Sequence, residues 1–324
     1  MKIVVPLLPQ FQAMDYTIDF SKITQYDNLE FVAKQVVEGF ITGIHKSPMH
    51  GFSVEFAEHR QYNTGEPTKH IDWKLYAKTD KLFVKCFEEE TNLRCHLVID
   101  NSSSMYFPLQ NSYTLASPNK IFFSIYAAAA LIQMLKNQRD AVGLSVFSDK
   151  LELHTSARGG ETHQKMIYRE LEKMLRPISA EVQRKSMVTD TLHRIAEQIH
   201  RRSMVIIFSD MLESNRNTEE LLLALQHLRH NKHEVILFHT YHKKLEFDFA
   251  LENRLYRFVD MESGEELKIH SNQIRDYYKA AIGDYFQELK IKCGQYQIDM
   301  IPADITKGFD QILLPYVLKR QKAN

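Results

Sequence analysis

The stretch Leu97-Val98-Ile99-Asp100-Asn101-Ser102-Ser103-Ser104 decides how this chain is interpreted. Its apolar start is typical of a buried strand, and Asp100, Ser102 and Ser104 follow at alternate positions. In an open α/β sheet, ligands bind just beyond the carboxyl ends of the strands. Carboxylate and hydroxyl oxygens are hard ligands that suit Mg²⁺ or Mn²⁺. A helix N-cap accounts for one such residue, whereas three exceed what capping needs. The stretch therefore predicts an α/β sheet with a metal site at its edge.

Two further segments supply candidate ligands. Ile206-Ile207-Phe208-Ser209-Asp210 is a second apolar run that ends in an aspartate. Because the carboxyl ends of parallel strands lie at one edge, Asp210 meets Asp100 if the two strands are neighbours. Asp210 is also compatible with a simple turn or cap. Ser186 lies at the expected entry of a helix, and Thr189, one turn further on, is the competing hydroxyl.

Strands and helices alternate from residue 93 onward, which predicts a mostly parallel sheet with helices on both faces. The expected strands are 94–100, 142–147, 204–208, 235–238 and 298–301, with 151–154 as a hairpin partner of the second. The expected helices are 120–136, 162–175, 188–201, 218–228, 271–290 and 309–318, the last kinked or split at Pro315.

Two shorter regions precede this α/β region, which spans 93–324. Residues 1–47 form a lead-in with a helix from Leu29 to Phe40, which Gly39 and Gly43 are expected to end. Residues 48–92 contain frequent glycine and proline breaks between extended pieces, which predicts a small β-rich segment.

The three ligand-bearing segments resemble the von Willebrand factor A-like domain and its metal-ion-dependent adhesion site. The first motif of that family, D-x-S-x-S, matches Asp100, Ser102 and Ser104. Its helix-entry threonine corresponds to Ser186, where this chain has serine, and its last aspartate corresponds to Asp210. The resemblance implies a Rossmann-like, von Willebrand factor A-like fold and a bound Mg²⁺ or Mn²⁺.

A second resemblance lies upstream of these motifs. SVEFAEHRQYNTGEP at 53–67, followed by HIDWKLYAKT at 70–79, is similar to the signature block of the bacterial "domain of unknown function 58" family. That resemblance implies frequent coupling to MoxR-type AAA+ ATPases. The favoured interpretation of the block is a buried ion-pair network with aromatic packing that docks the β-rich segment. The alternative is a partner-binding surface, whose candidate residues are Arg60, Tyr62, Asp72 and Trp73.

Composition narrows the class of function. Lysine plus arginine equals aspartate plus glutamate at 41 each, so no global field favours nucleic acid. Three cysteines without a CxxC pair predict a reducing, cytoplasmic location. The longest apolar stretch, about 121–135, falls short of the ~20 residues of a membrane span, so we expect no transmembrane segment.

The same chemistry favours binding over catalysis. A haloacid-dehalogenase-type phosphatase needs D-x-D, and Ser102 stands at the second position, where it is no general acid. Neutral serine ligands leave a cation under-neutralised, so the ion seeks a glutamate or aspartate carboxylate from a protein partner. We therefore expect a non-catalytic, metal-dependent adaptor, and the family resemblance implies a MoxR-type ATPase as its partner. The alternatives are a metal-dependent, phosphatase-like hydrolase and a scaffold whose metal site is degenerate.

Overall fold

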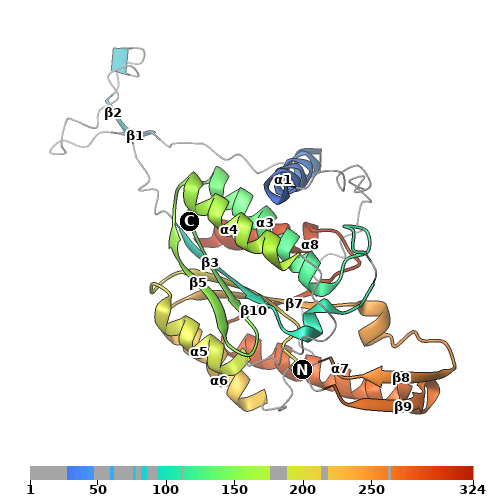
Figure 1. Ribbon diagram of the computed structural model, residues 1–324. Coiled ribbons are helices and arrows are strands. Elements are labelled where there is room, and N and C mark those ends of the chain that lie inside the picture. The colour runs from blue at the N-terminus through green and yellow to red at the C-terminus, as the bar shows by residue number, and fades with distance from the viewer. Residues whose placement is uncertain are drawn as a thin grey trace, which may run out of the picture.

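The computed structural model describes residues 28–46, 59–61, 76–77, 82–85, 93–110, 112–175, 188–212, 218–261 and 264–323. A six-stranded sheet with the order β10-β7-β6-β3-β4-β5 forms its centre (Figure 1). All neighbours in this sheet pair in parallel except β4 and β5. The strands are β3 (Arg94–Asp100), β4 (Ala141–Phe147), β5 (Leu151–Arg158), β6 (Met204–Ser209), β7 (Glu234–Tyr241) and β10 (Asp299–Asp304).

Helices cover both faces of this sheet, so the predicted mixed α/β architecture with a mostly parallel sheet is confirmed (Figure 1). One core lies between the sheet and α3 (Lys120–Asn137), α4 (Glu161–Met174) and α8 (Asp310–Ala323), and it continues to α1 (Leu29–Lys46), which packs on α3 and α4. The other lies between the sheet and α5 (Val188–Gln198), α6 (Thr218–His230) and α7 (Ser271–Gln295). Double coverage explains why β3 and β6 are almost continuously apolar and buried.

Several short elements complete the described chain. A 3₁₀ turn, η3 (Ser103–Tyr106), follows β3, and a π-helical turn, η4 (Lys243–Phe247), follows β7. The sequence predicted neither turn, nor the antiparallel pair β8 (Leu255–Val259) and β9 (Glu266–His270). In the expected β-rich segment, β1 (His59–Gln61) pairs antiparallel with β2 (Phe83–Lys85). Among the described residues, no helix combines the length and apolarity that a bilayer crossing requires.

The expected end of α1 at its glycines and the expected split of the last helix at Pro315 are wrong. Helix α1 continues through Gly39 and Gly43 to Lys46. Glycine costs a helix interior about 1 kcal/mol, and burial of the apolar stripe of α1 beside α3 offsets that cost. Helix α8 likewise runs through Pro315 as one element.

Burial again explains the second case, because side chains on both sides of Pro315 hold the helix on the core. Leu313 and Tyr316 are both fully buried there. Helix ends also differ from expectation: α5 ends at Gln198, not at residue 201, and α7 extends to Gln295. Such shifts are typical, because terminal turns carry little of the apolar periodicity.

Candidate metal site

The predicted ligands Asp100 and Asp210 come from neighbouring strands. Strands β3 and β6 are paired in parallel, with Ile99 opposite Phe208, so Asp100 lies beside the Ser209–Asp210 end of β6. From β3 the chain continues to β4 on one side, whereas β6 is followed by β7 on the other. The carboxyl ends of β3 and β6 therefore form the topological switch point of the sheet, where open α/β sheets bind ligands.

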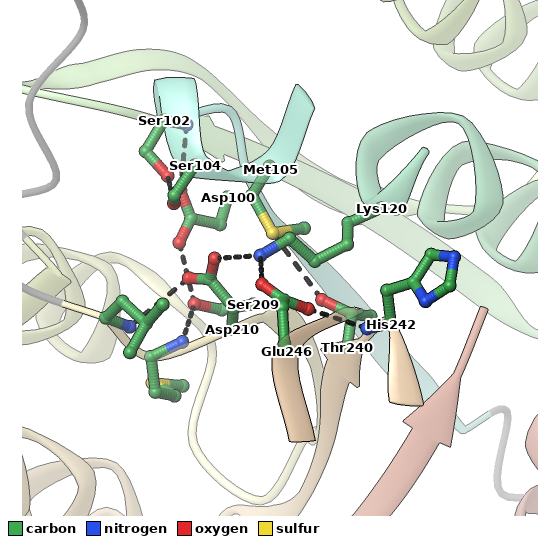
Figure 2. Close-up of polar contacts among 12 residues, drawn as sticks. Asp100, Ser102, Ser104, Met105, Lys120, Ser209, Asp210, Thr240, His242 and Glu246 are labelled. Carbon is green, nitrogen blue, oxygen red and sulfur yellow. Dashed lines mark hydrogen bonds and ion pairs between the residues drawn. The ribbon is translucent and has the colours of Figure 1, made fainter. Parts of the chain in front are cut away.

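Asp100 is fully buried and both of its carboxylate oxygens accept hydrogen bonds. The Ser102 backbone N–H donates to Oδ1 at 2.9 Å, and the Ser209 hydroxyl donates to Oδ2 at 2.6 Å. These two bonds fix the orientation of the carboxylate, and each oxygen keeps a second lone pair. Figure 2 shows the carboxylate between Ser209 and the two predicted serine ligands.

Ser102 and Ser104 place their hydroxyls side by side, with 3.0 Å between the Oγ atoms (Figure 2). Ser102 precedes η3, yet its side chain makes no capping hydrogen bond to that turn. The capping alternative therefore does not describe Ser102. Two oxygens on adjacent corners of a Mg²⁺ octahedron, each about 2.1 Å from the ion, lie about 3.0 Å apart. The two hydroxyls thus match the spacing of neighbouring metal ligands.

Asp210 is 2% exposed and pairs with a lysine that the sequence did not single out. Lys120 Nζ lies 2.7 Å from Asp210 Oδ2 and 2.7 Å from Glu246 Oε1 (Figure 2). The other oxygen, Asp210 Oδ1, accepts the Leu212 backbone N–H at 3.2 Å. Burial by itself disfavours the charged form of Lys120, but the two carboxylates raise its pKa above the ordinary value.

This cluster contains more negative than positive charge. Asp100, Asp210 and Glu246 carry three carboxylates against the single ammonium of Lys120. Burial, reinforced by the charge of Asp210, raises the pKa of Asp100 to about 7 despite its hydrogen bonds. With Asp100 ionised, the cluster has an excess of two negative charges, which a divalent cation would remove, and the oxygen donors are of the kind Mg²⁺ and Mn²⁺ prefer.

The donor set is poor in carboxylates all the same. Within the part of the chain that the structure describes, no three His, Cys, Asp or Glu side chains group closely enough to hold a metal. Any ion here is therefore held largely by Ser102, Ser104 and the two aspartates. These residues fit a hydroxyl-rich magnesium or manganese site and do not resemble a zinc or iron centre.

The remaining candidate residues are only partly covered. Ser186 lies outside the described residues, while Thr189 is buried in the first turn of α5, so the choice between them stays a prediction. Arg60 lies in β1, opposite Val84 of β2. The other three proposed partner-binding positions, Tyr62, Asp72 and Trp73, lie outside the described residues.

Lys120 was missed in the sequence, although one signal could have found it. It is the first residue of an otherwise apolar helix, where the positive end of the helix dipole disfavours a cation. A lysine in that place needs an anionic partner, which Asp210 supplies. Ser209 carried a weaker signal, its position directly before Asp210. Glu246 carried none, because the turn that holds it was not expected.

Fold and site together define an α/β protein with a buried, hydroxyl-rich polar cluster at the switch point of its sheet. The family described as "Protein of unknown function DUF58" matches residues 58–285. The chain belongs to this family, so the resemblance drawn from the 53–67 and 70–79 block is confirmed.

The curated relatives are mycobacterial. Uncharacterized protein Rv1480 of Mycobacterium tuberculosis (strain ATCC 25618 / H37Rv) is 27% identical over 184 residues, which cover 57% of this chain and 55% of the relative. Uncharacterized protein Mb1516 of Mycobacterium bovis (strain ATCC BAA-935 / AF2122/97) gives the same values. The chain therefore spans about half the length of the curated relatives it matches.

Similar solved structures are distant. A conserved hypothetical protein BatB from Bacteroides thetaiotaomicron is 11% identical, with a TM-score of 0.40 over 72% of this chain and 100% of that chain. An aerotolerance-related membrane protein from Bacteroides fragilis is also 11% identical, with a TM-score of 0.42 over 70% and 99%. At these scores, no functional conclusion follows from either likeness.

Proposed function

We propose that this chain is a metal-dependent protein-interaction module with a von Willebrand factor A-like fold. Asp100, Ser102 and Ser104, with Ser186 or Thr189, would hold Mg²⁺ or Mn²⁺, and Asp210 would act largely through water. The observation that carries the proposal is the switch-point cluster, which combines two buried carboxylates with two hydroxyls 3.0 Å apart. Its surplus of negative charge is what a divalent cation would neutralise.

A carboxylate from a partner protein would complete the coordination of the ion. Ser102 and Ser104 are neutral donors, and the charge of Asp210 is already shared with Lys120. An ion held mainly by such ligands keeps positive charge toward any open position. A glutamate or aspartate side chain is the protein ligand that best satisfies that charge.

The module is proposed to bind and not to catalyse. The position two residues after Asp100, where a phosphatase of the dehalogenase type has its general acid, holds Ser102. Membership of the family motivates a MoxR-type AAA+ ATPase as the partner class. The Lys120–Asp210 pair favours one alternative, a scaffold in which the lysine has replaced the metal and the site is degenerate.

Metal binding separates these functions directly. Calorimetric titration of the native chain with Mg²⁺ and with Mn²⁺ is expected to show one site. Asp100→Ala should abolish it, because the substitution removes a fully buried carboxylate of the cluster. Asp149→Ala is the matched control, since Asp149 is an exposed aspartate just beyond the neighbouring strand β4. Equal titrations for the native chain and Asp100→Ala would establish a degenerate site.

The partner half of the proposal needs its own test. A purified MoxR-type ATPase should co-sediment with the native chain in Mg²⁺ and lose this association in EDTA or with Asp100→Ala. The Asp149→Ala control should co-sediment like the native chain. Association that is insensitive to both EDTA and Asp100→Ala would contradict a metal-mediated contact.

A further inference from the structure

Lys120 holds its charge at the centre of the candidate site, and it is 1% exposed. Its ammonium contacts Asp210 Oδ2 and Glu246 Oε1, each at 2.7 Å (Figure 2). It also lies 5.8 Å from the centre of the Phe107 ring. The three groups come from the start of α3, the loop after β6 and the turn η4. The lysine is thus a fixed internal cation at the edge where the divalent ion is proposed to bind.

The backbone around Lys120 keeps the ammonium in place. Its own N–H donates to the Phe107 carbonyl at 3.0 Å, and the preceding Asn119 caps α3 by accepting the Phe122 N–H at 2.8 Å. The Asn119 amide also donates to the Tyr106 carbonyl at 3.3 Å. Because Tyr106 ends η3, these bonds tie the start of α3 to the turn that carries Ser104. Lysine and serine ligands therefore belong to one locally bonded unit.

Glu246 is held as firmly on the other side of the ammonium. Its second oxygen, Oε2, accepts the His242 backbone N–H at 2.6 Å, and its side chain is 16% exposed. The lysine therefore has two fixed carboxylate partners. Separating a buried ion pair is strongly destabilising, because it leaves a buried charge without its partner. The ammonium of Lys120 therefore stays paired with Asp210.

The ion pair with Lys120 limits Asp210 as a metal ligand. One of its oxygens faces Lys120, and the other accepts the Leu212 N–H. An aspartate whose charge is already matched at 2.7 Å is a weaker ligand for a second cation. The fully buried Asp100, in contrast, has only neutral hydrogen-bond donors on its two oxygens. The two aspartates are thus unequal in what they offer a divalent ion.

We propose that Lys120 is a positioning residue that reserves Asp210, keeping this aspartate out of direct coordination and leaving the ion with unbalanced positive charge. The inference rests on the proposed function and names the residue that regulates its site. It explains how a site with two aspartates still needs a carboxylate from outside. Lys120 thereby determines the affinity for the ion, and it leaves open the coordination position that a partner carboxylate fills.

A pair of substitutions tests this without changing the charge of the cluster. Lys120→Met with Glu246→Gln removes one positive and one negative charge and frees Asp210. We expect the affinity of this double variant for Mn²⁺ to rise by about tenfold over the native chain, measured by calorimetry. Glu246→Gln alone removes one of the two carboxylates that pair with Lys120 and leaves Asp210 as the other. The affinity for Mn²⁺ should therefore fall.

Asp210→Asn distinguishes positioning from a merely structural role. In the native background, this substitution should weaken Mn²⁺ binding only modestly, because Lys120 already occupies the carboxylate. In the Lys120→Met, Glu246→Gln background, it should weaken binding by about tenfold more, because Asp210 has become a direct ligand. A structural role for Lys120 would give the same effect of Asp210→Asn in both backgrounds.

The outcomes separate the two claims. If the native chain binds Mn²⁺ and the double variant binds equally or more weakly, the role of Lys120 is overturned and the proposed function stands. If the native chain binds neither Mn²⁺ nor Mg²⁺, the proposed function fails and this inference fails with it. If the double variant does not fold, as judged by circular dichroism, Glu246→Gln decides: unchanged or higher affinity overturns the inference.

Discussion

Two buried ionic clusters lie at opposite ends of the same sheet and differ in charge balance. At the amino end, Asp140 Oδ1 accepts the Leu93 N–H at 2.9 Å, and Oδ2 pairs with Arg320 of α8. Asp140 is 1% exposed, and its ion pair with Arg320 joins one anion to one cation. At the carboxyl end, the cluster around Asp100 sets three carboxylates against Lys120.

The comparison separates structural from functional charge. A buried pair that balances one to one needs nothing from outside, and its role is to fix α8 against the start of β4. A buried group with surplus charge is destabilising unless it takes up a proton or a further ion joins it. The unbalanced cluster lies at the switch point of the sheet, where ligands bind. The imbalance in that place is the feature on which the proposed cation site rests.

The largest effect is expected from breaking the balanced pair. Arg320→Met leaves Asp140 buried without its cation, which should lower the free energy of unfolding by about 3 kcal/mol. Mn²⁺ binding should be unchanged, because the pair lies at the far end of the sheet. Denaturant unfolding measures the first quantity and calorimetry the second.

Lys319→Met is the control for that substitution. Lys319 pairs with Asp299 at 2.6 Å, but the two side chains are 26% and 49% exposed, so the loss should stay below about 1 kcal/mol. Equal losses of unfolding free energy in the two variants would contradict a structural role for the buried Asp140–Arg320 pair. A loss of Mn²⁺ affinity in Arg320→Met would contradict its independence from the cluster around Asp100.

The buried, neutral His96 gives the next largest effect on the free energy of unfolding, and this effect depends on pH. His96 is 1% exposed, and its Nε2 hydrogen-bonds the Ser145 hydroxyl at 2.8 Å. Burial, with a smaller contribution from His154, lowers the pKa of His96 to about 3. Between pH 6.5 and 3 the unfolded chain binds a proton that the folded chain does not, so acidification removes stability.

At pH 5 this contribution amounts to about 2 kcal/mol relative to pH 8. His96→Gln keeps a side-chain amide near Ser145 and has no such titration. As the pH falls from 8 to 5, the unfolding free energy of the native chain should therefore decrease more than that of His96→Gln. A difference that stays constant from pH 8 to pH 5 would mean that His96 is not held neutral.

The smallest effect comes from relieving the unbalanced cluster. Asp100→Asn removes one of its surplus charges and keeps an oxygen that accepts the Ser102 N–H. Without metal, we expect this variant to be more stable than the native chain by about 1 kcal/mol, a gain typical of sites strained for function. Asp149→Asn, at an exposed position, should change stability by less than about 0.5 kcal/mol.

Much of this architecture was predictable because parallel strands covered on both faces are apolar throughout. The runs that end at Asp100 and Asp210 marked two strand ends, and the shared edge of a parallel sheet brought them together. The D-x-S-x-S spacing then placed Ser102 and Ser104 beside them. Those inferences needed only local pattern and one rule of topology.

The cation partner was not predictable in the same way. Lys120 is 90 residues from Asp210 and 126 from Glu246, and no local pattern encodes such pairings. Glu246 lies on a π-helical turn that has no distinct periodicity in the sequence. The dipole rule could have marked Lys120 as needing an anion, but the identity of that anion depended on the order of the strands.

The most direct measurement compares the unfolding free energies of the native chain and Asp100→Asn, each without metal and with saturating Mn²⁺. The surplus charge should make Asp100→Asn the more stable protein without metal. Bound ion should stabilise the native chain and reverse that order, because binding to the folded state alone adds to its stability. An order that is the same with and without Mn²⁺ would contradict a cation site at the switch point.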